Sequence, residues 1–221
     1  NSFGNQAESL VSFWVFPGFT FKGTKEVILT VAARSEVEFV SGGAVTPLVE
    51  PSGGVPPSQP IVWNVKRVKA DLVWPNYTGQ GAVVCIFDYG MREDHESYGS
   101  ATNWKWRDEY GWPNAWFDAE GQHNRPYDYN GHGTHVGGIA IGGDGGVSIP
   151  GIGVAYGAKL IACRPSAHHG CFEWIASLAN TPANTPRGDL APDVVNCSWG
   201  DKVYMWNLEF WQDVLTLRAL A

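Results

Sequence analysis

Three runs of apolar residues restrict the folds that are open to this chain. They are "GAVVCIFDYG" at residues 81–90, "AKLIACR" at residues 158–164 and "PDVVNCSWG" at residues 192–200. Strands with continuous apolar sequence are buried on both faces, as in parallel sheets. Because helical segments separate these runs, we predict an α/β fold in which helices flank a parallel sheet.

Three segments between and after these strands are expected to be helical. A helix rich in small residues follows Gly133, and a second helix covers "CFEWIASLAN", where Phe172 and Ile175 share one face. A third helix is expected over residues 206–221, where apolar side chains also align on one face.

The residues before the first of these strands have a different composition. Residues 10–21 are typical of a strand that ends near a Pro-Gly turn, Thr24 can cap a helix over residues 25–34, and residues 37–40 form a second short strand. Gly, Pro and Ser then dominate residues 41–60, as in exposed linkers. We therefore predict a small α+β domain over residues 1–50, a linker over residues 51–60 and a larger domain over residues 61–221.

Composition makes two classes of partner unexpected. The 221 residues carry a formal net charge of −7 and contain no run of Lys or Arg, whereas nucleic-acid binding requires a basic face. No apolar stretch approaches the roughly 20 residues that a membrane-spanning helix needs. We therefore expect neither nucleic acid nor a membrane span.

Two polar residues follow the predicted strands directly. Asp88 ends the first apolar run, and Ser198 lies near the end of the third. Functional sites of parallel α/β sheets lie at the carboxyl ends of the strands, so both residues are candidates for a site. Each also has a structural alternative, since Asp88 can cap a turn and Ser198 can be an ordinary serine at a strand end.

The stretch "DYNGHGTHVGG" at residues 128–138 places His132 at the start of a helix. The helix dipole opposes a permanent positive charge there and so favours a neutral imidazole that can act as a base. His135 lies one turn further on and is expected to serve packing. Two histidines three apart can bind a metal, but no third ligand is evident, so we predict no metal site.

In combination, these motifs resemble the subtilisin-like serine proteases (peptidase S8, subtilase family). The resemblance lies in an Asp at the end of a buried strand, in "GHGTHVGG" and in "APDVVNCSWG", and it follows the Asp, His, Ser order of that family. Within the family, the chain is most similar to the bacillopeptidase F-like branch. "VSFWVFPGFTFKGTKEVI" also resembles the later half of the family's inhibitory propeptide.

The resemblance implies a serine endopeptidase and assigns roles to particular residues. Asp88 would hold the tautomer of His132, and His132 would be the general base. Ser198, Trp199 and Gly200 would match the edge segment that pairs with an extended peptide or protein substrate, so Ser198 would not be the nucleophile. The Trp-rich insert at residues 103–117 would lie near the cleft, where its tryptophans either shape pockets or cover the core.

The chain departs from the family pattern at several points. Tyr89 replaces the usual Thr after the aspartate, and Ser97 falls where many members have a calcium-binding Asp, so no cofactor is expected. The Gly-Thr-Ser-x-Ala-x-Pro segment with the nucleophile does not occur in the 221 residues. We therefore expect that the fold is incomplete in this chain, that the nucleophile lies outside it, and that a second chain or a further segment completes the sheet.

Two functional classes follow from this departure. The first is the amino-terminal portion of an extracellular or secretory-pathway endopeptidase, kept as a zymogen by a propeptide whose tail lies near residues 46–51. The second is a truncated, inactive subtilase-fold protein that acts as a structural or binding module.

The four cysteines leave one pairing open. Cys85 and Cys197 lie in apolar strands and are expected to be buried thiols. Cys163 and Cys171 flank a short segment and either form a disulfide or remain reduced. A metal site made by these two cysteines with His168 and His169 matches no standard zinc spacing, and a solvated loop is the preferred interpretation.

Overall fold

The structure is a computed structural model that describes residues 7–13, 18–38, 40, 60–165, 168–178 and 190–199. These residues belong to two compact units, one with the described residues up to 40 and one with those from 60 onwards. Except for Pro60, the predicted linker at residues 51–60 lies outside the described residues, as does the predicted helix at residues 206–221.

The amino-terminal unit consists of a hairpin and a helix. Strands β1 (Ala7–Phe13) and β2 (Gly18–Gly23) pair antiparallel, so the apolar run at residues 10–21 forms parts of two strands instead of one. Helix α1 (Lys25–Ala32) begins after Thr24, whose hydroxyl accepts the Val27 N–H at 3.4 Å. This bond confirms the predicted helix cap.

The strand predicted at residues 37–40 is wrong in this structure. Val37, Glu38 and Val40 lie outside any strand, and Phe39 is outside the described residues. A strand requires a partner for its backbone N–H and C=O groups, and no described strand pairs with these residues. Apolar alternation over four residues therefore did not suffice to predict a strand.

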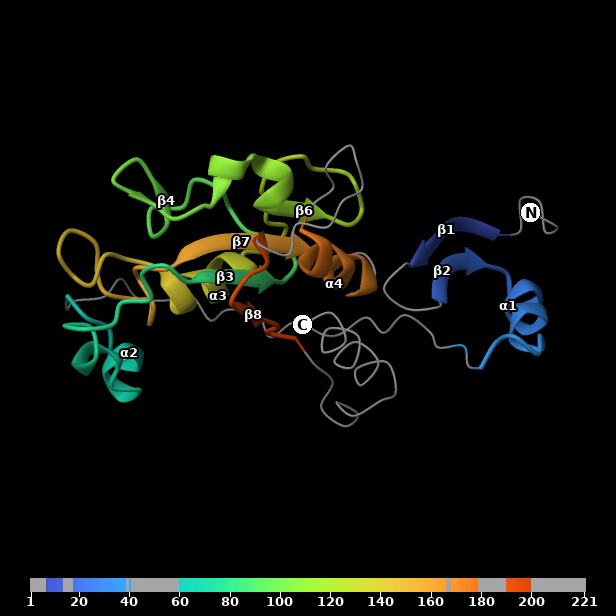
Figure 1. Cartoon of the computed structure of the whole chain (residues 1–221), viewed down its shortest axis with the longest axis horizontal. Helices are drawn as coiled ribbons and strands as arrows, with labels where there is room; N and C mark the ends of the chain where they lie inside the picture. Colours follow the sequence, from blue (N-terminus) through green and yellow to red (C-terminus); the bar gives the residue numbers. More distant parts are fainter. Residues whose placement is uncertain are drawn as a thin grey trace. The chain divides into compact units, whose positions relative to one another are not determined.

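The second unit is built around a parallel sheet of four strands in the order β6–β7–β3–β8 (Figure 1). The strands are β3 (Val83–Phe87), β6 (Trp116–Asp118), β7 (Lys159–Arg164) and β8 (Val194–Asn196). Three of them fall in the three apolar runs, so the predicted α/β fold with a parallel sheet is confirmed. The fourth, β6, lies in the Trp-rich insert and was not predicted.

Two helices cover opposite faces of this sheet. Helix α3 (His132–Ile141) contacts the face that carries Ile86, and helix α4 (His168–Ser177) packs Phe172 against Phe87, with ring centroids 5.0 Å apart. Ile86 and Phe87 are consecutive in β3 and so point to opposite faces. Both sides of the central strand are therefore buried, as its continuous apolar sequence predicts.

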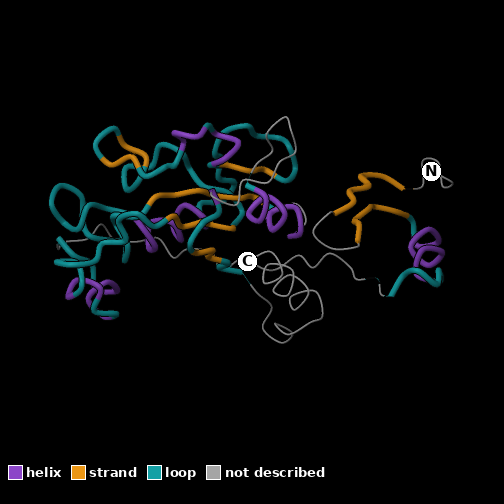
Figure 2. The backbone as a smooth tube through the Cα atoms, viewed as in Figure 1, coloured by secondary structure: helices purple, strands orange, loops and turns teal. Residues whose placement is uncertain are grey.

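Shorter elements complete the second unit. Helix α2 (Trp63–Arg67) and the 3₁₀ turn η2 (Ala70–Leu72) precede β3. Between β3 and β6 lie β4 (Gly99–Ser100), β5 (Asn103–Trp104), η3 (Asp108–Tyr110) and η4 (Trp112–Asn114), joined mainly by loops (Figure 2).

The tryptophans of the insert mainly cover the core. Trp106 and Trp116 are buried in the cluster on the α3 side of the sheet, and Trp112 packs against that cluster. Trp104 is the exception, since 38% of its surface is exposed. Of the two predicted roles, covering the core therefore fits three of the four tryptophans.

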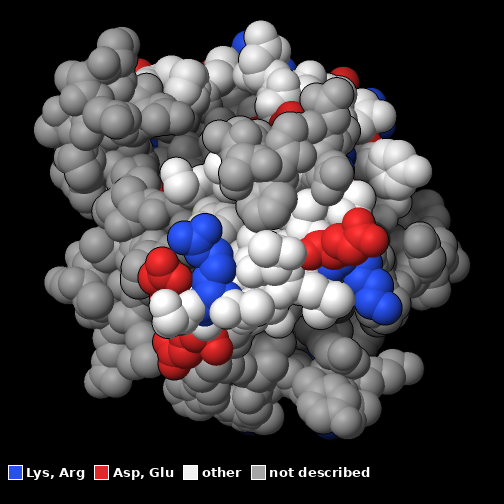
Figure 3. All heavy atoms as spheres, turned by 90° about the vertical axis from the view of Figure 1, so that its right-hand side faces the viewer, with Lys and Arg blue, Asp and Glu red and all other residues white. Residues whose placement is uncertain are grey.

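Charge is mixed on the face drawn in Figure 3, where basic and acidic side chains of the described residues lie side by side. Among the described residues, no helix is both long and apolar enough to cross a membrane.

Candidate active site

Asp88 lies where strand β3 leaves the sheet. Its N–H donates to the Cys163 carbonyl at 3.1 Å, which continues the pairing of β3 with β7 by one more residue. The residue is only 1% exposed, and its Oδ1 accepts the Tyr89 N–H at 2.8 Å. The sheet therefore fixes both the backbone and the carboxyl group of Asp88 at its carboxyl edge.

His132 is the first residue of helix α3, and its imidazole reaches Asp88. The His132 Nδ1 and Asp88 Oδ1 atoms are 2.8 Å apart, although 44 residues separate the two positions in the chain. His132 is 7% exposed, so the hydrogen bond is largely shielded from water. The structure thus brings together the two residues that the sequence proposed as a pair.

Two glycines make this approach sterically feasible. A Cβ atom on Gly133 would overlap the Gly90 carbonyl oxygen and lie 3.0 Å from the Asp88 Cβ. Gly90 itself has a φ of +132°, which side-chain-bearing residues rarely adopt. Close contact between these two backbones therefore brings His132 within hydrogen-bonding distance of the aspartate.

The electrostatic surroundings of Asp88 have opposing effects. Burial raises the pKa of its carboxyl group above the ordinary value, while the hydrogen bonds from His132 and the Tyr89 N–H act to lower it. An ionised Asp88 accepts the Nδ1 proton of the imidazole, which leaves Nε2 as the ring nitrogen with a free lone pair. The pair can therefore act chemically as an oriented general base.

Asp128 is a residue of this region whose role was not predicted from the sequence. Its carboxylate accepts hydrogen bonds from the N–H groups of Asn130, Gly131 and Thr134 and from the Thr134 hydroxyl. The N-cap of α3 is Gly131, and Asp128 lies three residues before it, so the usual preference for Asp at the N-cap gave no signal for this role.

His135 does not have the predicted packing role. Its side chain is exposed, on the outer side of α3, whereas His132 is buried. Three residues along a helix leave two positions about 60° apart around the axis, and here His132 lies at the edge of the buried face of α3 while His135, like Ile139, lies on the exposed face. Among the described residues, no group of three or more His, Cys, Asp or Glu side chains could hold a metal ion.

Comparison with known proteins identifies the family to which this site belongs. The sequence model of Peptidase_S8, the subtilase family, matches residues 79–219. The chain belongs to the subtilase family. The match includes both Asp88 and His132.

Two curated relatives are consistent with this assignment. Bacillopeptidase F of Bacillus subtilis (strain 168) is 31% identical over 219 residues, which cover 88% of this chain and 15% of that protein. The intracellular serine protease of Paenibacillus polymyxa is 32% identical over 115 residues, which cover 50% of this chain and 32% of that protein. The predicted similarity to the bacillopeptidase F-like branch of the subtilases is confirmed. The chain spans less than a third of the length of either relative.

The segment that resembles the Ser-x-Gly edge of the subtilases follows strand β8, beside β3. Ser198 is exposed and accepts a hydrogen bond from the Asn196 side-chain amide at 2.8 Å. The Trp199 indole donates to the Phe87 carbonyl at 2.9 Å, and the two rings meet edge to face at 5.1 Å. Gly200 lies outside the described residues. No hydrogen bond within the described structure joins Ser198 to Asp88 or His132.

The region around Ser97 tests whether this subtilase fits a calcium ion. The Ser97 carbonyl oxygen already accepts bonds from the Gly143 N–H at 2.8 Å and from the Asn103 amide at 2.5 Å. Lys105 is 7% exposed and donates to the Tyr156 carbonyl, and burial lowers the pKa of its amine to about 8.

The nearby acidic loop offers no better ligands. The Asp144 carboxylate accepts hydrogen bonds from the N–H groups of Gly146, Val147, Ser148 and Ile149. Calcium requires six to eight oxygen ligands, and here the available oxygens face N–H donors and a buried amine. The described residues around Ser97 therefore do not fit a calcium ion.

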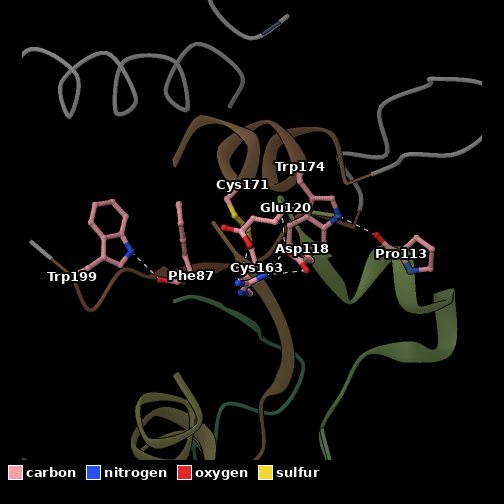
Figure 4. Close-up of a disulfide and its surroundings, with 9 residues drawn as sticks. Phe87, Pro113, Asp118, Glu120, Cys163, Cys171, Trp174 and Trp199 are labelled. Carbon is pink, nitrogen blue, oxygen red and sulfur yellow. Dashed lines mark hydrogen bonds and ion pairs between the residues drawn. A yellow bond between two sulfur atoms is a disulfide. The ribbon is translucent and has the colours of Figure 1, made fainter. Parts of the chain in front are cut away.

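The structure settles the open cysteine pairing. Cys163 at the end of β7 and Cys171 in α4 form a disulfide, with their Cα atoms 5.9 Å apart (Figure 4). In this structure the disulfide uses both of the cysteines that were considered as metal ligands together with His168 and His169. The segment from His168 is also helical, so the solvated loop predicted there is wrong.

The other two cysteines differ from each other. Cys85 is buried in β3, as predicted, and burial raises the pKa of its thiol well above the ordinary value. Cys197 is exposed, which contradicts the prediction that it is buried. The reason is that β8 ends at Asn196 and pairs with β3 on one side only within the described sheet.

Proposed function

We propose that this chain forms the amino-terminal part of the catalytic domain of a subtilisin-like serine endopeptidase. The observation that supports this most directly is the buried 2.8 Å hydrogen bond between His132 Nδ1 and Asp88 Oδ1. In the proposed reaction Asp88 keeps the imidazole in the tautomer with a proton on Nδ1. His132 Nε2 then removes the proton of a serine hydroxyl that attacks the peptide carbonyl.

The nucleophilic serine is proposed to come from a segment outside these 221 residues. Ser198 does not fit this role, because it is exposed and bonded to Asn196 and not to His132. The same additional segment, or a second chain, would complete the sheet beyond the described strands. Unpaired strand edges otherwise favour association with other chains.

The end of β8 is the proposed contact for the peptide or protein substrate. Ser198, Trp199 and Gly200 would offer main-chain groups that pair with an extended peptide, as in recognition by strand addition. The hydrogen bond from the Trp199 indole to the Phe87 carbonyl supports this proposal. It attaches the segment to the residue that directly precedes Asp88.

The amino-terminal unit is proposed to be a propeptide that keeps the enzyme a zymogen. Its hairpin and helix α1 have the sequence that resembles the family's propeptide, and its tail would lie near residues 46–51. Amino-terminal sequencing of the mature protein tests this, since a mature start near Ile61 would indicate removal of the unit. Secretion is also proposed, and the Cys163–Cys171 disulfide supports it because such bonds persist in oxidising compartments.

Calcium is not proposed to bind near Ser97, because the oxygens there already accept hydrogen bonds from the chain itself. Calcium and its chelation should therefore leave hydrogen exchange in residues 143–157 unchanged. Increased protection of that loop by calcium would contradict this part of the proposal.

Labelling with a fluorophosphonate tests the enzymatic proposal in the full protein that contains this chain. A labelled serine outside the 221 residues is expected, and Asp88→Asn and His132→Ala should each reduce the labelling rate by roughly 10³-fold or more. His135→Ala is the matched control, because this exposed histidine lies three residues from His132. A folded protein that takes up no label would contradict the proposal and favour the inactive binding module.

A further inference from the structure

Asp128 occupies a central position between the two segments that carry the candidate site. Its Oδ1 accepts the N–H groups of Asn130 and Gly131 at 3.1 and 2.8 Å. Its Oδ2 accepts the Thr134 N–H at 3.0 Å and also the Thr134 hydroxyl. One carboxylate therefore fixes four donors over the turn that begins helix α3.

The same turn sets the backbone of His132. The Asn130 side-chain oxygen accepts the His132 N–H at 3.0 Å, and the Gly131 carbonyl accepts the first α-helical bond, from His135, at 3.0 Å. Asn130 and Gly131 are the two residues that Asp128 Oδ1 binds. The Asp128 carboxylate therefore acts on the His132 backbone in two ways, once through Asn130 and once through Gly131.

Asp128 also connects this turn to the segment that follows Asp88. Gly90 and Asp128 form an antiparallel bridge, and the Met91 N–H donates to the Tyr127 carbonyl at 3.1 Å. The Thr134 hydroxyl donates to Asp128 and accepts the Arg92 N–H at 2.9 Å. These bonds join the segment that follows Asp88 to residues on both sides of His132.

We infer that Asp128 is a positioning residue of the site, whose carboxylate fixes the start of α3 against the segment after Asp88 and thereby sets the His132–Asp88 hydrogen bond. The effect of Asp128 on catalysis rests on the proposed function, whereas its effect on the position of His132 rests on the hydrogen bonds alone. The negative charge of Asp128 also acts to raise the pKa of Asp88, as a smaller contribution than burial. Asp128 touches neither substrate nor the reacting atoms and acts through the backbone.

The chain offers a matched control for the stability that any such carboxylate provides. Asp144 also accepts four hydrogen bonds, in this case all from backbone N–H groups, and all within the loop at residues 144–149. Asp128→Asn and Asp144→Asn both replace a carboxylate by an isosteric amide that loses acceptor capacity. The two variants should therefore have similar melting temperatures and differ in their effect on His132.

The measurement is the NMR resonance of the proton between His132 Nδ1 and Asp88, recorded on the full protein that contains this chain. Asp128→Asn should shift or broaden this resonance and speed its exchange with water, while Asp144→Asn should leave it unchanged. An unchanged resonance in Asp128→Asn, or an equal change in both variants, would overturn the inference.

A second pair of variants covers the case in which Asp128→Asn does not fold. Thr134→Val removes the hydroxyl that links Asp128 to Arg92, whereas Thr134→Ser keeps it. The resonance should change in Thr134→Val and be retained in Thr134→Ser, and equal behaviour of the two would contradict the link through the hydroxyl.

Activity separates this inference from the proposed function. In the full protein, Asp128→Asn should lower kcat by about 10–100-fold with a small change in KM, because a misplaced base slows the chemical step. A resonance change in a protein with no activity in any form would leave the positioning role intact and contradict the proposed function alone. A resonance change with unaltered kcat in an active protein would contradict the catalytic consequence of the positioning role.

Discussion

The Asp88–His132 region and the end of β8 lie at the same carboxyl edge of the sheet, but they are held in different ways. The first is buried between two closely packed backbones, and Asp128 fixes the turn that presents His132. At the second, Ser198 is exposed, and the neighbouring Trp199 donates its indole N–H to the Phe87 carbonyl. The proposed general base is therefore held in the buried part of the sheet edge, whereas the proposed substrate segment lies at an exposed strand end.

This difference predicts that adding a side chain between the packed backbones beside His132 costs more stability than removing contacts near Ser198. Gly133→Ala should have the largest effect, about 3 kcal/mol in the free energy of unfolding, since its Cβ would overlap a main-chain oxygen. Urea unfolding of the chain measures it. Gly138→Ala is the control in the same helix, because its Cβ would lie 3.7 Å from Ile152 Cδ1, an ordinary contact. Equal stability of the two variants would show that the two segments are not closely packed.

Removing the disulfide tests whether helix α4, on the other face of the sheet, helps to hold the backbone of Asp88 in place. Cys163→Ala combined with Cys171→Ala should lower the free energy of unfolding by about 2 kcal/mol, because the link between β7 and α4 is lost. The Asp88 N–H bonds to the Cys163 carbonyl, so its hydrogen exchange should also become faster. Cys197→Ala serves as the control at an exposed cysteine and should change neither quantity. Unchanged exchange at Asp88 in the double variant would confine the effect of the disulfide to α4.

The sequence predicted the centre of this fold well, because burial on both faces leaves a direct mark on composition. Strands β3 and β7 lie within the predicted runs, and α3 begins at the predicted histidine. The strand and helix predictions depend on local sequence that the tertiary structure reinforces. The pairing of Asp88 with His132 was instead implied by the resemblance to the subtilases, because the two residues are 44 positions apart in the chain.

Other features depend on contacts that local sequence does not encode. Strand β6 has three residues and forms because β7 offers a free edge beside it. Residues 37–40 have comparable strand propensity but no partner strand among the described residues. Cys197 is exposed because β8 ends one residue before it. His135 is exposed because it lies on the outer face of α3. Propensity and pattern were therefore insufficient wherever a distant partner decides the outcome.

Trp199 offers a direct test of the exposed end of the proposed site. Trp199→Leu removes the indole N–H bond to Phe87 and an edge-to-face ring contact, so the free energy of unfolding should fall by about 1 kcal/mol. Chemical denaturation measures this loss. Trp63→Leu is the control, because Trp63 is 78% exposed and should contribute little. A loss as large as that of Gly133→Ala would mean that the two ends of the site are equally supported.

The smallest change in stability is expected from Asp88→Asn, and it should depend on pH. Burial raises the pKa of Asp88 in the folded state, although bonds from His132 and the Tyr89 N–H partly offset this effect. The folded protein therefore holds the proton more tightly, and its stability should fall as pH rises from the ordinary Asp pKa through the raised one. Asp88→Asn cannot ionise, so it should gain stability relative to the parent chain over this interval.

Asp94→Asn should behave in the opposite way, because the exposed Arg92 lowers the pKa of Asp94. Urea unfolding at several pH values measures this difference. Parallel pH profiles of the free energy of unfolding for the parent chain and Asp88→Asn would show that burial does not disfavour the ionised form of Asp88. The buried pair would then behave like an exposed group, as at the end of β8.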